Sequence, residues 1–294
     1  MTVSSIAAAT TAEEQHGTHW FFLQPPVFPG FRTSFILSLL YVGVVILFPI
    51  SGLFVYASAM TWPDFWQAIT DARVVASYWV TISAAFYATI AAALIGMLFA
   101  WNIERYDFPG RRLLDALIDL PFALPTAVAG LTLSVLLVPG GWLGQFLAPL
   151  GIKVAYAYPG LVVAMTFTSL PFVVRLVQPV LQDFPVESEE AAKTLGASRV
   201  LVFWKVILPA LVPALVAGAS QAFVRNLGEF GAVIMISGNI PFRTEVTSLM
   251  IFVRMQEYNY PAAAAIASVM LVVSLLLLWG LQLLQARVLR WQRR

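Results

Sequence analysis

The sequence predicts an all-α polytopic membrane protein. Of the 294 residues, 60% are hydrophobic and 11% are charged, and the mean hydropathy is +0.83, whereas soluble chains hold roughly 45–50% apolar residues. The apolar residues gather in uncharged stretches near the about 20 residues that a helix needs to cross a bilayer. Because backbone polar groups have no water to bind in hydrocarbon, such stretches are predicted to be helical.

Six stretches are long enough to cross the membrane, and two of them are interrupted. Pro121 and Pro125 remove helix hydrogen bonds from the third, and Arg225 and Glu229 place charge inside the fifth. The predicted spans are Ser34–Ala59, Trp79–Trp101, Asp115–Val138, Tyr158–Val174 with an extension toward Val177, Val206–Ile236 and Pro261–Ala286.

The distribution of lysine and arginine predicts the orientation. Six spans leave both termini on one side of the membrane, and the side whose short loops carry more basic residues is cytoplasmic. Twelve basic residues lie on the side of the termini and four on the other. We therefore expect cytoplasmic termini, a partly disordered cytoplasmic tail over residues 1–30 and one membrane domain over residues 31–294.

The composition excludes several kinds of chemistry. Cysteine is absent, and the only histidines, His16 and His19, lie in the N-terminal tail. We therefore predict neither catalytic residues nor a metal site in the spans. No G-x-x-x-x-G-K-[ST] phosphate loop is present, so any ATP must be bound by another subunit. The net charge of +2 is too small to indicate a nucleic-acid partner, and we expect no cofactor in this chain.

The stretch ESEEAAKTLGASRVLVFWKVILPAL, which begins at Glu187, concentrates charge between the fourth and fifth spans. Three glutamates after Pro185 complement the dipole of a helix N-terminus, and Gly196 is a helix stop. A second helix over Val200–Ile207 is expected to enter the membrane at Leu208–Pro209. Helix rules alone leave two interpretations open: an ordinary interfacial helix or a docking site for another protein.

The spacing within this stretch resembles the EAA motif of bacterial ABC-importer permeases, E-A-A-x3-G-x9-I-x-L-P. Val206 stands where that family usually has isoleucine, and the other fixed positions match. In that family the loop is cytoplasmic and its helix docks in a groove of an ATPase subunit. The resemblance implies a type I ABC importer permease fold with a coupling loop at about 183–209. The implied coupling residues are Glu189, Glu190, Ala191, Ala192, Leu195, Gly196, Leu208 and Pro209.

The interrupted third and fifth spans supply candidates for a substrate path or gate. Arg225 and Glu229 are four residues apart, so on one helix face they can neutralise each other. Arg225 is expected about 24 Å along the helix from Pro209, in its outer half. A purely structural ion pair, and an ordinary kink in the third span, are the alternatives. The candidates are Arg225, Asn226, Glu229, Thr126, Pro125 and Gly130.

Longer blocks resemble the T-type permease subunits of sulfate/thiosulfate importers. These blocks are R-x-L-G-E-F-G-A from Arg225, Asp119–Leu133 and Gly238–Val269. The resemblance implies transport of sulfate or thiosulfate from a periplasmic binding protein across the bacterial inner membrane by alternating access. It also implies a homologous W-type permease and two copies of an ATPase subunit that bind ATP and Mg. A molybdate/tungstate permease and a secondary anion transporter are the alternatives.

One outer segment, Ser237–Tyr260, is predicted to contain a short amphipathic helix. Its apolar face either lies on the membrane or packs as a cap over the bundle. The residues of that face are Val246, Leu249, Met250, Val253 and Met255.

Overall fold

The computed structural model describes residues 31–292, so the predicted N-terminal tail lies outside the described residues. Within 31–292 the chain forms helices and no strand. The described residues divide into two compact units, and the boundary in the sequence falls between Gly52 and Leu53. The all-α class is therefore confirmed for the described part of the chain.

The first predicted span is one helical stretch, Phe31–Ser58, of 28 residues. It consists of α2 (Phe31–Tyr41), a π-helical turn η1 (Val42–Leu47) and α3 (Phe48–Ser58). The π turn ends just before Pro49, whose ring displaces the carbonyl four residues earlier.

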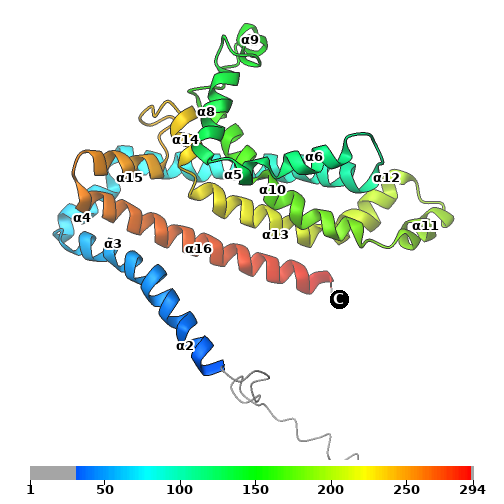
Figure 1. The fold of residues 1–294 in the computed structure, drawn as a ribbon, viewed down its shortest axis with the longest axis horizontal. Coiled ribbons are helices and arrows are strands. Elements are labelled where there is room, and N and C mark those ends of the chain that lie inside the picture. Colours follow the sequence, from blue (N-terminus) through cyan, green and yellow to red (C-terminus); the bar gives the residue numbers. More distant parts are fainter. Residues whose placement is uncertain (1–30, 293–294) are drawn as a thin grey trace, which may run out of the picture. The chain divides into compact units, whose positions relative to one another are not determined.

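Three long helices form the centre of the second unit. They are α5 (Ala72–Arg105), α10 (Tyr158–Gln182) and α13 (Leu208–Leu227). Helix α10 packs against both of the others (Figure 1). Gly96 on α5 and Gly218 on α13 both lie against Val173 on α10. A Cβ at Gly218 would lie 2.9 Å from the Val173 Cα. Small residues at this crossing let the backbones approach closely, as is common in membrane bundles.

The last span, α16 (Tyr260–Gln292), contacts α13 and also α15 (Thr247–Gln256) and α4 (Trp62–Thr70). Val246 and Leu249 on the predicted amphipathic segment are almost fully buried, and Met250 packs with Val74 and Ile266. The segment is therefore a packed cap over the bundle, with Met255 as an exposed exception.

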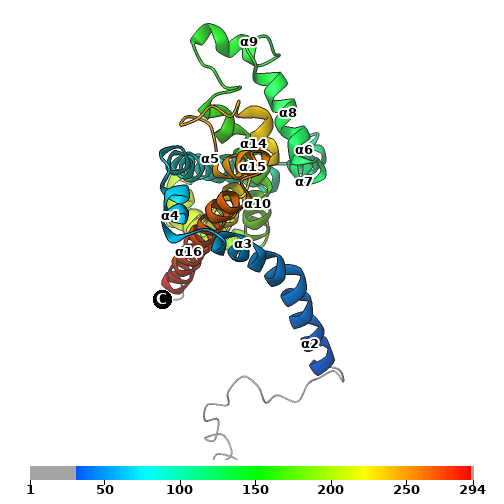
Figure 2. The same cartoon turned by 90° about the vertical axis from the view of Figure 1, so that its left-hand side faces the viewer.

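The third span differs from the continuous helix predicted over Asp115–Val138. It is divided into α6 (Arg111–Ile118), α7 (Leu120–Ala123) and α8 (Thr126–Leu137). Leu124 is extended, as expected for a residue before proline, so the helix restarts only after Pro125. In both views α8 leads away from the bundle, and α9 (Gly144–Leu147) and η2 (Ala148–Leu150) follow it (Figures 1 and 2).

The fifth span was also predicted to be one helix, to Ile236, and this prediction is wrong. After α11 (Val186–Thr194) the chain forms α12 (Arg199–Val202), a π turn η3 (Phe203–Ile207) and then α13. Helix α13 ends at Leu227, and α14 (Gly231–Ile236) starts after a short break. Gly228 at the end of α13 is a poor helix former, which favours the break.

Five described helices are long and apolar enough to cross a membrane. The third predicted span contributes only the 12-residue α8, which is shorter than a spanning helix usually is. The structure therefore supports a multi-pass membrane protein with five long candidate spans.

Candidate functional site

The charged loop folds as a short helix with well-defined ends. Pro185 precedes α11 in an extended conformation, and Glu187 and Glu189 occupy its first turn. Gly196 has φ +83° and donates its N–H to the Lys193 carbonyl at 2.9 Å, while Ala197 donates to Ala192 at 3.1 Å. This pair of bonds is a Schellman motif, which requires a left-handed residue at the position of Gly196. The prediction that Gly196 ends the helix is confirmed.

Helix α11 has an inner side and an open side. Ala192 packs against the core cluster that contains Leu181 and Val202. Ala191 and Glu190 are exposed, and Leu195 at the end of the helix is 88% exposed. The open side of α11 therefore carries an exposed leucine together with the small side chain of Ala191.

Glu189 holds the inner side of α11 to the end of α5. Its Oε1 lies 2.7 Å from Nη2 of Arg105. The Arg105 guanidinium also lies over the rings of Trp101, at 5.4 Å, and Phe184, at 5.9 Å. Sequence spacing gave no signal for this pair, because 84 positions separate its members.

The loop continues into the bundle without a gap. Ser198 accepts a hydrogen bond from the Leu201 N–H at 3.3 Å and so caps α12. The following π turn leads to Leu208 and Pro209, which begin α13 and are half-buried. The loop therefore joins α11 to the long apolar helix α13 through the short elements α12 and η3.

The break between α13 and α14 holds the predicted charged pair. Nη1 of Arg225 lies 2.7 Å from Oε2 of Glu229, and the two side chains are 35% and 1% exposed. The other oxygen of Glu229 accepts the Ala232 N–H at 3.0 Å, at the start of α14. The predicted pairing is confirmed, although it joins the last turn of one helix to the break after it rather than two turns of one helix.

Asn226 lies in the packing interface beside this pair. It is fully buried, and its Nδ2 donates to Ser169 at 3.2 Å and to Thr89 at 3.4 Å. The amide therefore links α13 to both α5 and α10. Its surroundings are those of a helix-packing residue.

The three candidates of the third span lie at the start of α8, against α14. A Cβ at Gly130 would overlap the backbone of Ala232, and a Cβ at Gly231 would overlap the Thr126 hydroxyl. Pro125 precedes α8 and is exposed. The structure thus brings Thr126, Gly130 and the break after α13 into one place.

A polar network near the end of α5 was not predicted. Arg175 donates to both oxygens of Asp119, at 2.9 and 2.6 Å, and to Asp115 at 2.6 Å. It also donates to Gln178, whose amide reaches Glu104 at 2.7 Å. The predicted span ended at Val174 or near Val177, whereas α10 continues to Gln182 and contains Arg175.

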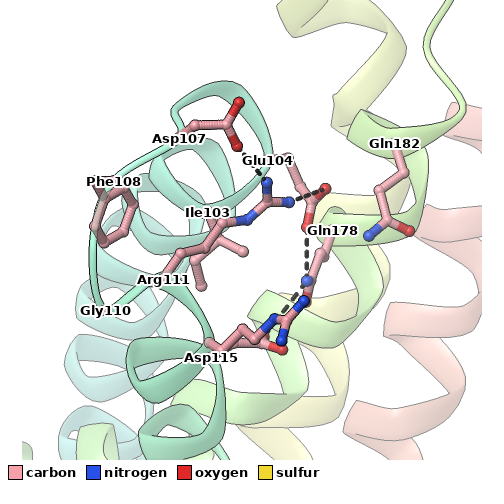
Figure 3. A pocket seen from close by; sticks show the side chains of 10 residues that line it. Ile103, Glu104, Asp107, Phe108, Gly110, Arg111, Asp115, Gln178 and Gln182 are labelled. Carbon is pink, nitrogen blue, oxygen red and sulfur yellow. Dashed lines mark hydrogen bonds and ion pairs between the residues drawn. The ribbon is translucent and has the colours of Figure 1, made fainter.

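The network borders a cavity of about 620 Å³ between the end of α5, α6 and α10. Figure 3 shows Arg111 between Asp107 and Glu104, with ion-pair distances of 3.0 and 3.4 Å. The sequence feature that could have indicated this network is the spacing of Asp115 and Asp119, which lie four residues apart and so on one helix face. Within residues 31–292 no group of three or more His, Cys, Asp or Glu side chains is placed to hold a metal.

Another unpredicted ion pair lies at the start of α5. Arg73 makes two bonds of 2.7 Å to Glu245, which is 1% exposed. Next to it, Thr81 accepts the Thr247 N–H at 2.8 Å. These contacts fix α15 on the start of α5.

The family is shown by direct comparison. Residues 92–290 match the model of the family described as binding-protein-dependent transport system inner membrane component. The chain belongs to this family, and it is a multi-pass permease subunit of an ABC importer rather than an enzyme. A crystal structure of a bacterial ABC transporter that imports alginate has a similar fold, with a TM-score of 0.73 over 87% of this chain and 94% of that one, at 15% identity.

Particular relatives narrow the class further. The sulfate transport system permease protein CysT of Salmonella typhimurium is 59% identical over 261 residues, which cover 89% of this chain and 94% of the relative. The protein of the same name from Escherichia coli is 58% identical over the same shares. That from Synechocystis is 43% identical over 88% of this chain and 89% of the relative. The predicted resemblance to T-type sulfate permease subunits is confirmed.

Proposed function

We propose that the chain is the T-type membrane-spanning subunit of an ATP-driven importer of sulfate and thiosulfate. The observation that carries this proposal is the 59% identity to a sulfate permease over 89% of the chain. The substrate passes from a periplasmic binding protein to the cytoplasm by alternating access. The subunit lies in the bacterial inner membrane with cytoplasmic termini, and the broken third segment with α8 is its sixth crossing.

The driving force enters through α11. Two copies of an ATPase subunit bind ATP and Mg, and one of them docks on the open side of α11, at Glu190, Ala191 and Leu195. The inner side of α11, through Glu189 and Ala192, transmits the motion to α5 and the core. Gly196, Leu208 and Pro209 give the loop its two bends, so α13 moves with α11.

The outer path lies at the break after α13. Broken helices expose backbone groups at membrane depth, which are tolerated where protein or cavity water satisfies them. Arg225 offers a partly exposed guanidinium for a dianion, and Glu229 compensates its charge. Thr126, Pro125 and Gly130 border the same place, and a homologous W-type subunit supplies the opposite wall. High affinity belongs to the binding protein, because a tight site within the path would trap the ion.

The test is uptake of labelled sulfate by vesicles from a strain whose only sulfate importer contains this chain. ATP-dependent uptake that equimolar molybdate leaves unchanged is the expected result. Strong inhibition by molybdate would assign the chain to molybdate or tungstate transport. Uptake that persists without ATP would indicate a secondary anion transporter. Affinity purification with identification of the associated ATPase and second permease tests the proposed partners.

A further inference from the structure

An apolar groove lies between the end of α5 and the segment that leads into α13. It has a volume of about 420 Å³. Its apolar walls are Met97, Leu98 and Trp101 on one side and Val200, Phe203 and Trp204 on the other. Arg199, the first residue of α12, is the single charged residue among those that line it.

The groove is open at the molecular surface, and aromatic rings in contact with one another form part of its walls. Leu98, Val200 and Trp204 are 63%, 68% and 59% exposed. The rings of Trp101 and Phe203 meet edge to face at 5.4 Å, and Phe203 meets Trp204 at 5.6 Å. Tryptophan rings at the end of a spanning helix are typical of the membrane interface, where one face is apolar and the other is wet. The groove therefore lies at the level where lipid chains meet their headgroups.

Charge distinguishes this groove from an ordinary lipid-facing surface. Arg105, at the end of α5 near the groove, is neutralised by Glu189. Arg199 has no carboxylate partner among residues 31–292, and the same holds for Lys205 nearby. Arg199 can therefore pair with a negatively charged headgroup while the apolar groove takes up a hydrocarbon chain. This combination suits an anionic lipid.

We propose that this groove binds an anionic phospholipid of the cytoplasmic leaflet. One acyl chain lies along Leu98 and Val200, between the aromatic rings, and the phosphate pairs with Arg199. Trp101 lines the groove and also contacts the Arg105 guanidinium, which pairs with Glu189 on α11. A bound lipid therefore touches the same ring that holds the Arg105–Glu189 pair in place.

Native mass spectrometry of the purified importer complex, titrated with phosphatidylglycerol or neutral phosphatidylethanolamine, tests the site. Wild type is expected to retain phosphatidylglycerol in preference to phosphatidylethanolamine. Arg199→Gln is expected to weaken phosphatidylglycerol binding about fivefold, the usual effect of one interfacial charge. Lys205→Gln removes the same charge outside the groove and is expected to have little effect. An equal loss in both variants, or no preference for the anionic lipid, would overturn the proposal.

A steric variant tests the groove independently of charge. Val200→Trp fills the slot from an exposed position, so it is expected to reduce phosphatidylglycerol binding without unfolding the complex. Val272→Trp, on an exposed face of α16, adds the same bulk elsewhere and is expected to leave binding unchanged. Lipid binding that survives both Arg199→Gln and Val200→Trp would overturn the proposal. Crosslinking of a photoreactive residue at position 204 to a partner subunit rather than to lipid would do the same.

Discussion

Arg105 and Glu189 tie the end of α5 to the first turn of α11 through an ion pair of 2.7 Å. Their side chains are 18% and 13% exposed, and the aromatic rings of Trp101 and Phe184 cover the guanidinium. Because both charges are largely shielded from water, removal of either one leaves the other poorly solvated. The pair therefore fixes the proposed coupling helix on the bundle.

Arg105→Gln is predicted to weaken the docking of α11 by about 1–3 kcal/mol, the cost of leaving a buried charged partner unsatisfied. Sulfate uptake by the complex should fall while the ATPase subunits still hydrolyse ATP. Asp107→Asn is the matched control, because Asp107 is 98% exposed in its own pair with Arg111 and should have little effect. Equal uptake in wild type and Arg105→Gln would contradict the predicted role of the pair.

Gly196→Ala is predicted to strain the end of α11. A residue with a Cβ pays about 1–2 kcal/mol to adopt the φ of +83°. The added methyl group meets no atom within 4 Å, so the expected cost comes from the backbone conformation and not from a clash. Gly196→Asn should be milder, because asparagine tolerates the left-handed region better. ATPase stimulation by the binding protein, measured in the assembled complex, should therefore rank glycine above asparagine and asparagine above alanine. A different order would rule out backbone geometry as the reason for this glycine.

Gly130→Ala is predicted to push α8 away from α14. The added methyl group overlaps the Ala232 backbone, and overpacking of this kind costs about 1–3 kcal/mol. The control is Gly140→Ala, which meets nothing within 4 Å and should change stability by less than about 0.5 kcal/mol. Thermal unfolding of the purified complex distinguishes the two variants, and equal midpoints would show that the α8–α14 contact is not needed.

Exchange of the charges of Arg225 and Glu229 is predicted to restore function only in part. The pair itself can form in the reversed sense, but an arginine at position 229 cannot accept the Ala232 N–H. Glu229→Gln keeps an acceptor and should assemble better than Glu229→Ala. Complex yield and sulfate uptake are the two measurements. Full recovery of both by the double exchange would mean that the bond to α14 has no role.

Local sequence signals predicted the loop and its ends because those features depend on neighbouring residues. Gly196 was identified from spacing, and its left-handed backbone is the physical reason. The Arg225–Glu229 contact was predicted for the same reason, since its members are four residues apart. The position of the break was not predicted, because Gly228 is only a weak helix breaker inside an apolar run.

The ion pairs between distant segments could not be predicted in the same way. Arg175 meets Asp119 across 56 positions, and Arg73 meets Glu245 across 172. Such pairs depend on which helix faces meet, and an apolar span carries little information about the face that packs inward. The third span shows the same limit, because Pro125 indicated a kink whereas the chain separates into three helices.

Coupling of ATP hydrolysis to transport through α11 can be tested by sulfate uptake into proteoliposomes that contain this chain, the W-type subunit, the ATPase and the binding protein. The decisive comparison is wild type against Leu195→Asp, with Leu195→Met as the conservative control, because an 88% exposed leucine contributes little to the fold. Uptake is expected to require internal ATP, to be retained with methionine and to be lost with aspartate. Uptake without ATP, or uptake that Leu195→Asp leaves unchanged, would contradict ATP-driven transport coupled through α11.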